Sequence, residues 1–168
     1  MYDMVVKDNF LDGTHLIQLD ELIDNPLFAW FLQKEQIKGT KDGCWFSHMI
    51  YATESPRSNL YDPVSEMFWS YLKYVSLLRI SINLLPRQNP PSISDYHVDI
   101  DDKRITTAIF YLNTNNGYTE FKDGNKIESV RNRLIMFPAN TSHRAISQTD
   151  TSVRIVLNFN FIEKMRES

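Results

Sequence analysis

The segment Val153-Arg-Ile-Val-Leu-Asn-Phe-Asn-Phe161 alternates between two kinds of side chain. On a β-strand successive side chains point to opposite faces, so Ile155 and every second residue after it form an apolar face. Arg154 and every second residue up to Asn160 form a face that is mostly polar. One interpretation is a strand with its apolar face on the core and its polar face in water. A second is a strand covered by helices on its apolar face, whose polar face lines a pocket for an anionic ligand. The strand alone leaves both interpretations open.

Alternation of this kind recurs along the second half of the chain. It begins at residues 79–84, and a loop rich in proline and serine follows at 86–95. The segment Lys122-Asp-Gly-Asn125 predicts a β-hairpin, because Asp-Gly accepts the positive φ that such a turn requires. Further strands are expected at 93–99, 104–112, 118–121, 126–130, 132–137 and 143–147. Short strands at this spacing predict an antiparallel sandwich or open barrel.

Two helices are expected before these strands. Residues 12–24 carry leucines and an isoleucine near helical spacing. The second helix is predicted to begin with Asp62 as its N-cap and Pro63 at its first helical position. Its apolar residues, from Val64 to Val75, lie on one stripe. We expect both helices to pack on an outer face of the sheets, which gives a mainly β fold with flanking α-helices.

A single domain is expected to span residues 1–168, because this length supports one core and no Gly/Ser linker divides the chain. Within it, residues 1–78 are expected to form a helical N-terminal support. Residues 79–162 are expected to form the β core.

Composition argues against several classes of protein. The formal net charge of −3 provides no cationic field for a nucleic-acid backbone. Cys44 is the only cysteine, which excludes a disulfide framework and a zinc site built from cysteines, and we interpret it as an inert buried thiol. No apolar run approaches the ~20 residues that span a bilayer, and the first ten residues do not resemble a signal peptide. We expect a cytoplasmic protein that binds neither membranes nor nucleic acids.

Three residues form a candidate metal site. In Asp95-Tyr-His-Val-Asp99, His97 and Asp99 are two residues apart, so on a strand the imidazole and the carboxylate point the same way. A second histidine, His143, follows an apolar strand later in the chain. Two histidines and one carboxylate make the facial triad of non-haem iron oxygenases. The alternative is two unrelated histidines, because a His-x-Asp pair arises by chance about 0.3 times in such a composition.

Arg154 supports the metal hypothesis. A guanidinium binds a carboxylate through two parallel hydrogen bonds and stays charged inside a pocket. A dicarboxylate that chelates a metal through a 2-oxo acid end needs such a partner at its far end. His97, Asp99, His143 and Arg154 therefore form one connected proposal.

The sequence resembles the 2-oxoglutarate- and iron(II)-dependent dioxygenases, in particular the small prolyl 4-hydroxylase-like branch, a type also found in marine bacteria and their phages. The resemblance covers about residues 79–161. The matching segments are His97-Val-Asp99, Thr107-Ala-Ile-Phe-Tyr-Leu-Asn113, Gly117-Tyr-Thr-Glu-Phe121, Asn132-Arg-Leu-Ile-Met-Phe137, His143 and Arg154-Ile-Val-Leu-Asn158. The family often has paired glycines where this chain has only Gly117. The fold implied is a double-stranded β-helix, a jelly-roll or cupin-like barrel.

The resemblance also implies roles for individual residues. Iron(II) is implied to bind His97, Asp99 and His143, and the distal carboxylate of 2-oxoglutarate is implied to pair with Arg154. Tyr111 matches a tyrosine whose hydroxyl shares that carboxylate. Asn83 and Asn158 are further candidates for contact with the co-substrate. The cofactors implied are iron(II), 2-oxoglutarate as co-substrate and O2, and ascorbate is expected to stimulate the reaction.

The activity implied is hydroxylation of an unactivated C–H bond with release of succinate and CO2. The prime substrate is expected to be a peptidyl residue, with proline as the guess from the family, or a small metabolite. Two alternatives remain, a catalytically silent jelly-roll binding module and a non-redox metal cupin. Neither gives a reason for Arg154. The loop at 86–95 is a candidate wall of the substrate groove.

The remaining polar residues are given structural interpretations. His48 lies among apolar residues and is expected to be a hydrogen-bonded core or edge histidine. Arg87 is interpreted as a solvated loop residue. Arg131, Arg133 and Arg144 are interpreted as surface charges.

Overall fold

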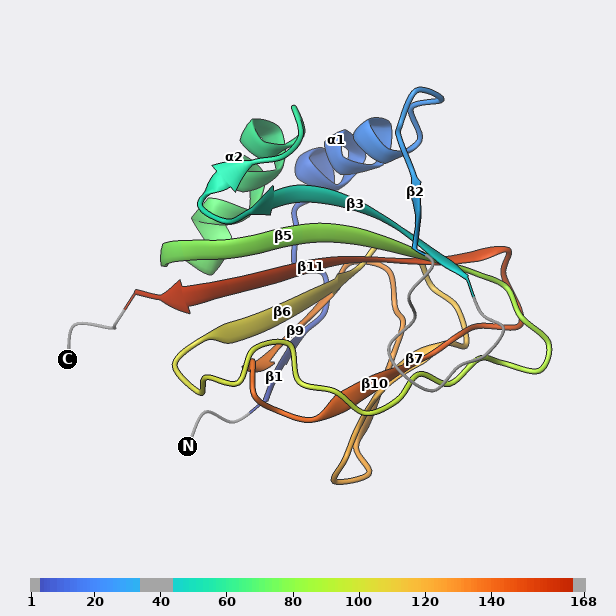
Figure 1. The fold of residues 1–168 in the computed structure, drawn as a ribbon. Helices are drawn as coiled ribbons and strands as arrows, with labels where there is room; N and C mark the ends of the chain where they lie inside the picture. The colour runs from blue at the N-terminus through green and yellow to red at the C-terminus, as the bar shows by residue number, and fades with distance from the viewer. Residues whose placement is uncertain (1–3, 34–43, 165–168) are drawn as a thin grey trace.

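The computed structural model describes residues 4–33 and 44–164 (Figure 1). Most of its elements are strands, and the helices lie in the first half of the chain. In chain order the elements are β1 (Val5–Lys7), α1 (Gly13–Ile23), β2 (Phe31–Gln33), β3 (Trp45–Ala52), β4 (Ser55–Pro56), α2 (Tyr61–Leu72), β5 (Tyr74–Pro86), β6 (Thr106–Tyr111), β7 (Tyr118–Phe121), β8 (Lys126–Glu128), β9 (Arg133–Pro138), β10 (His143–Ile146) and β11 (Val153–Glu163).

The strands form two antiparallel sheets. The larger sheet has the order β1-β9-β6-β11-β5-β3-β2, with β4 paired to β3, and the smaller has the order β10-β7-β8. Isolated bridges join Ile93 to Ile146 and His97 to His143, so the segment before β6 runs beside β10. In Figure 1 the helices lie on the outer side of the larger sheet and the smaller sheet lies across its other side. The predicted double-stranded β-helix is confirmed.

Strand β11 lies in the middle of the larger sheet, and both of its faces are covered. On the apolar face Phe159 is fully buried, and its ring centroid lies 4.7 Å from that of Phe68 in α2. On the other face Arg154 is only 2% exposed and Asn160 is fully buried. The polar face therefore points into the interior rather than into water, as the second interpretation of this strand expects, and the anionic ligand stays a prediction.

Both predicted helices exist, with one difference at each end of α2. Asp12 caps α1, and its carboxylate accepts a hydrogen bond from the backbone N–H of His15. Helix α2 begins two residues earlier than predicted, so Asp62 lies in its first turn rather than at the N-cap. It ends at Leu72, before Val75, because the chain turns there and enters β5. Val75, the last residue of the predicted apolar stripe, is instead an exposed residue of β5.

The N-terminal part is less helical than predicted. Strands β1 and β3 pair with β9 and β5, so this part of the chain supplies both edges of the larger sheet. Strand β5 begins at Tyr74, and the predicted boundary between residues 78 and 79 falls inside it. The strand predicted at 93–99 is reduced to the isolated bridges. Within the described ranges, no helix is long and apolar enough to cross a membrane.

Candidate active site

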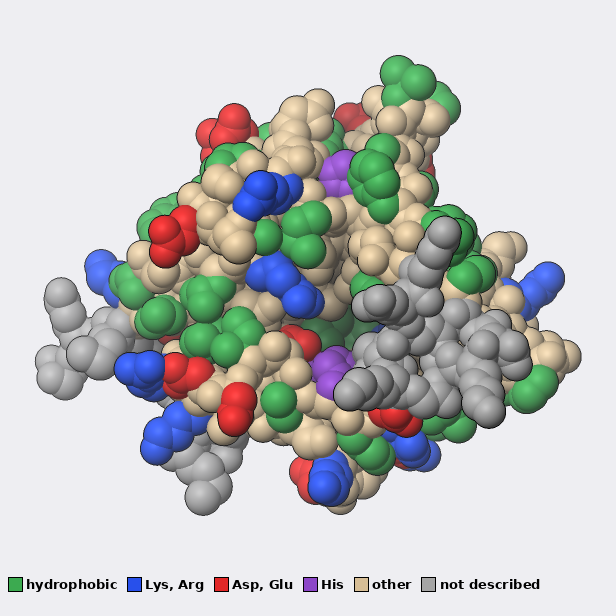
Figure 2. Space-filling view, viewed as in Figure 1, with side chains coloured by type: hydrophobic (Ala, Val, Ile, Leu, Met, Phe, Trp, Pro, Cys, Tyr) green, Lys and Arg blue, Asp and Glu red, His purple; other side chains and the backbone are tan. Residues whose placement is uncertain are grey.

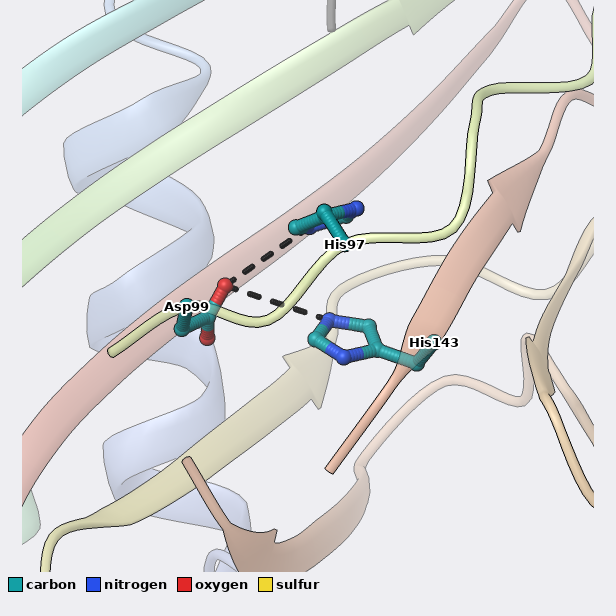
Figure 3. Close-up of side chains that lie close together, drawn as sticks. All are labelled: His97, Asp99 and His143. Carbon is teal, nitrogen blue, oxygen red and sulfur yellow. Dashed lines mark ion pairs between the residues drawn. The ribbon is translucent and has the colours of Figure 1, made fainter. Parts of the chain in front are cut away.

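His97, Asp99 and His143 meet at one point between the two sheets (Figure 3). The Nε2 atoms of His97 and His143 lie 3.7 and 3.9 Å from Oδ1 of Asp99. One ligand atom from each residue lies within 4.8 Å of the others. Asp99 and His143 are almost fully buried, whereas the His97 side chain is 29% exposed. The group therefore has the spacing of a three-ligand metal site that is open on one side.

Backbone contacts fix which nitrogen of each imidazole faces the centre. Nδ1 of His143 lies 2.9 Å from the carbonyl oxygen of Thr141, and Nδ1 of His97 lies 3.3 Å from that of Asp95. A carbonyl oxygen only accepts, so in a neutral imidazole Nδ1 carries the proton and Nε2 keeps its lone pair. Burial lowers the pKa of His143 below its ordinary value, which keeps this ring neutral and able to bind a metal.

The carboxylate of Asp99 is held by one of its two oxygens. Oδ2 accepts hydrogen bonds from Oγ1 of Thr107 at 2.8 Å and Nδ2 of Asn160 at 3.2 Å, which leaves Oδ1 directed at the two imidazoles. Burial alone raises the pKa of Asp99, but His143, Arg79 and these hydrogen bonds outweigh burial and lower it. The donor set that faces the centre is two imidazole nitrogens and one carboxylate oxygen, which suits iron(II).

Arg154 extends from β11 across the interior toward the smaller sheet. Its Nε donates to Oγ of Ser129 at 2.7 Å, and its Nη2 donates to Oγ1 of Thr119 at 3.2 Å. No described acidic residue forms an ion pair with it. Two hydroxyl groups thus hold a buried guanidinium in place without neutralising its charge.

Tyr111 lies behind this guanidinium. Its hydroxyl donates to Oγ1 of Thr119 at 2.8 Å, and Cζ of Arg154 lies 5.5 Å from the centre of its ring. Burial raises the pKa of Tyr111, which keeps the hydroxyl protonated as a donor. Tyr111 does not line the cavity described below, although the resemblance implies that its hydroxyl shares the distal carboxylate of 2-oxoglutarate. Its contact with the co-substrate stays a prediction.

Gly117 is required by the path of Arg154. A Cβ atom at this position would lie 2.8 Å from Cδ of Arg154 and 2.9 Å from the backbone oxygen of Ile146. A Cβ atom does not approach other non-bonded heavy atoms this closely in real structures. Gly117, the single glycine where the family often has a pair, therefore leaves room for the side chain of Arg154.

A cavity of about 370 Å³ connects the metal-ligand group to Arg154. All three candidate ligands line it, as do Arg154, Asn83 and Asn158. Figure 2 shows the molecule hollowed on this face, with acidic and histidine side chains at the edge of the hollow. The structure thus brings together every predicted site residue except Tyr111, which lies one layer deeper. Whether these residues bind iron and 2-oxoglutarate stays a prediction.

Sequence analysis missed several residues of the site. Arg79 lines the cavity from β5, on the same strand face as Asn83, so the period of two could have identified it. Thr119 and Ser129 could not have been found, because they reach Arg154 only through the tertiary fold. Arg144 also lines the cavity. It was interpreted as a surface charge.

Arg144 belongs to a network beside the metal-ligand group. Its guanidinium donates to the Glu120 carboxylate and lies 4.3 Å from the ring centre of Tyr96. The Tyr96 hydroxyl donates to the same carboxylate at 3.2 Å. Since Tyr96 precedes His97 and Arg144 follows His143, this network ties together the two segments that carry the imidazoles.

The other structural interpretations have mixed outcomes. Cys44 is exposed and lines the cavity, so the interpretation as a buried thiol is wrong. His48 bonds the carbonyl oxygen of Ala29 and the hydroxyl of Ser58, as expected for a satisfied edge histidine.

Comparison with known proteins identifies the fold. No protein-family model and no curated protein sequence matches the chain. Solved structures do match, and the first is a prolyl-4-hydroxylase from Pseudomonas putida, with a TM-score of 0.60 and 15% identity over 95% of this chain and 92% of that one. A prolyl hydroxylase from Trichoplax adhaerens, in complex with a peptide fragment of the hypoxia inducible factor, has a TM-score of 0.66 and 15% identity over 95% and 83%. The fold is that of the 2OG-Fe(II) oxygenases.

This oxygenase fold does not by itself specify one reaction. An α-ketoglutarate-dependent epimerase from nogalamycin biosynthesis matches with a TM-score of 0.64 and 12% identity over 95% of this chain and 78% of that one. The reaction of this protein must therefore be inferred from its own site.

Proposed function

We propose that the protein is a 2-oxoglutarate- and iron(II)-dependent oxygenase that hydroxylates an unactivated C–H bond and releases succinate and CO2. The observation that carries the proposal is a shared cavity. The candidate ligands His97, Asp99 and His143 line this cavity, and so does Arg154, a buried guanidinium without an acidic partner among the described residues.

The metal-ligand group fits iron(II). His97 and His143 present Nε2 and Asp99 presents Oδ1, while hydrogen bonds to their other polar atoms hold each side chain in that orientation. Iron(II) bound there supplies the oxygen and redox chemistry. The protein contributes orientation, charge and exclusion of water, and Thr107 and Asn160 keep Asp99 from rotating away.

The other end of the cavity fits a carboxylate. A buried arginine without an anion is costly, and a bidentate carboxylate would neutralise it. Ser129 and Thr119 hold the guanidinium, so little ordering is needed when the distal carboxylate of 2-oxoglutarate arrives. A silent binding module or a non-redox metal cupin has no use for this arrangement.

The finer assignments extend the proposal. The whole chain, residues 1–168, serves as one oxygenase domain, since strands from its N-terminal part complete the larger sheet. O2 is the second co-substrate, and ascorbate is expected to stimulate turnover. The prime substrate is a small metabolite or a peptidyl residue, for which the prolyl hydroxylases of the same fold make proline the first candidate.

Anaerobic titration with iron(II) and 2-oxoglutarate tests the proposal. The wild-type protein should develop the weak visible charge-transfer band of the chelate, and admission of O2 should then release succinate. Arg154→Ala should weaken 2-oxoglutarate binding by about 2–5 kcal/mol while leaving iron binding largely intact.

The matched control is Arg87→Ala, which removes an exposed arginine from the loop and should bind 2-oxoglutarate as the wild type does. Folded, iron-loaded protein that shows neither the band nor succinate would contradict the proposal. Equal affinity of Arg154→Ala and the wild type would contradict the role given to Arg154.

A further inference from the structure

Four polar residues, which we call the polar floor, lie on paired strands beside the cavity: Arg79 and Ser81 of β5, and Asn158 and Asn160 of β11. Asn158 lies opposite Ser81 and Asn160 lies opposite Arg79 in the ladder that joins the two strands. All four side chains share the strand face that points into the interior. Arg79 and Asn158 line the cavity directly.

The polar floor has unused hydrogen-bonding capacity. Four of its buried atoms have no partner among the described residues, namely Nε of Arg79, Oγ of Ser81 and Oδ1 of both asparagines. Buried polar atoms in proteins nearly always have partners, because each one left unpaired costs about 1–3 kcal/mol. Such atoms side by side on two paired strands indicate a place for a polar ligand.

The polar floor lies next to the candidate ligands and far from Arg154. Nδ2 of Asn160 donates to Oδ2 of Asp99, so the floor begins directly beside the metal-ligand group. Arg154 lies six residues from Asn160 along β11, which is about 20 Å for a strand. Arg79 lies opposite Asn160, so a 2-oxoglutarate molecule between the metal and Arg154 would leave the guanidinium of Arg79 free.

The charge of Arg79 has no partner either. No described acidic residue forms an ion pair with it. Asp99 is the nearby acid, but its free oxygen is directed at the imidazoles. A metal bound there would add positive charge close to Arg79, and an anion beside the guanidinium would balance it.

We propose that the polar floor binds the carboxylate of the prime substrate, and that this substrate is a small organic acid or amino acid. The inference rests on the proposed function and gives that function a substrate class. Arg79 donates to the carboxylate, while Oδ1 of Asn158 accepts a hydrogen bond from a donor group elsewhere on the substrate, such as the amino group of an amino acid. The cavity of about 370 Å³ is at the small end of the ~300–1,000 Å³ typical of ligand sites and is shared with the co-substrate. A small substrate therefore fits better than a peptide.

Acetate serves as the probe, with acetamide as its neutral counterpart. The protein is loaded with manganese(II) and saturating 2-oxoglutarate without oxygen, and the relaxation of the acetate methyl protons by manganese is measured. We expect saturable enhancement for acetate and none for acetamide. Arg79→Gln should weaken acetate binding by about ten- to a hundredfold, the usual range for a hydrogen bond to a charged group. Arg79→Lys should retain part of the affinity.

Arg87→Gln, at an exposed loop position, is the matched control and should bind acetate normally. If manganese and 2-oxoglutarate bind but acetate binds equally well to wild type and Arg79→Gln, the inference is wrong and the proposed function stands. If the wild type binds neither manganese nor 2-oxoglutarate, the proposed function itself fails. Tighter binding of the peptide acetyl-Gly-Asp-Gly-amide than of acetate would overturn the assignment of a small substrate. Equal binding of acetamide would overturn the assignment of a carboxylate.

Discussion

The two faces of strand β11 come from one alternating segment and have different surroundings. On one face Leu157, Phe159 and Phe161 are fully buried among the side chains of the helices and the larger sheet. On the other face Arg154 and Asn160 are equally buried, but against hydroxyl groups, a carboxylate and a cavity. Burial therefore does not distinguish the two faces, whereas the partners of each side chain do.

This difference separates stability from binding within one strand. Apolar side chains packed without gaps contribute to the free energy of folding, and their loss leaves a cavity. A buried guanidinium without a counter-ion contributes little to folding, since its desolvation is not repaid by an ion pair. We expect substitutions on the apolar face to reduce stability and substitutions on the polar face to reduce binding.

The largest effect is expected from Phe159→Ala. This fully buried ring contacts Phe68, so its removal should lower the free energy of unfolding by about 3–5 kcal/mol. Urea denaturation of the metal-free protein measures the loss. Ile162→Ala on the same strand removes a side chain that is 38% exposed and should cost far less. An equal decrease in the free energy of unfolding for Phe159→Ala and Ile162→Ala would contradict the stabilising role given to the packed apolar face.

Arg154→Met should change ligand binding without a large change in stability. Methionine fills a similar volume without a charge, so the free energy of unfolding should stay within about 1 kcal/mol of the wild type or rise. The affinity for 2-oxoglutarate should nevertheless fall by about 2–5 kcal/mol. Calorimetric titration and urea denaturation of one preparation measure both. A decrease in the free energy of unfolding as large as that of Phe159→Ala would show that the polar face contributes as much to stability as the apolar face.

A smaller effect is expected from Thr107→Val, which removes the shorter of the two hydrogen bonds to Oδ2 of Asp99. Loss of a residue that orients a metal ligand lowers metal affinity by about 10- to 100-fold. Thr106→Val is the control, because Thr106 points to the opposite face and donates to Glu163. Competition with a chelator should show weaker iron(II) binding for Thr107→Val alone. Equal affinity of both variants would contradict the role of Thr107.

The smallest effect concerns pH. Burial lowers the pKa of His143, so between pH 7.5 and 5.5 the unfolded chain takes up more protons at this residue than the folded protein does. Stability of the metal-free protein should therefore decrease as the pH falls below about 6.5, the ordinary pKa of histidine. In His143→Gln this decrease should be smaller. An unchanged decrease would show that His143 titrates normally in the folded protein.

The strands predicted from the sequence are those with regular alternation. Strands β5 to β11 were all found, although several begin or end elsewhere than expected. Strand β3 was missed, because a register irregularity between Met49 and Tyr51 interrupts its pairing with β5, and its mostly apolar residues do not alternate. A period of two cannot detect a strand that does not keep it.

The candidate site shows the same limit. The pair His97 and Asp99 is local and could be found by its spacing, whereas the contact of both with His143 depends on pairing between distant segments. The period of two could have placed Arg79 on the same strand face as Asn83, but its position opposite Asn160 in the ladder is specified only by the fold. Local periodicity thus identifies the face of a strand, and tertiary pairing decides which faces form one site.

The most direct test is an anaerobic crystal structure of the protein with manganese(II) and 2-oxoglutarate. We expect the metal on Nε2 of His97, Nε2 of His143 and Oδ1 of Asp99, and the distal carboxylate of 2-oxoglutarate on Arg154. A metal bound elsewhere, or a distal carboxylate paired with Arg79 instead of Arg154, would contradict this account.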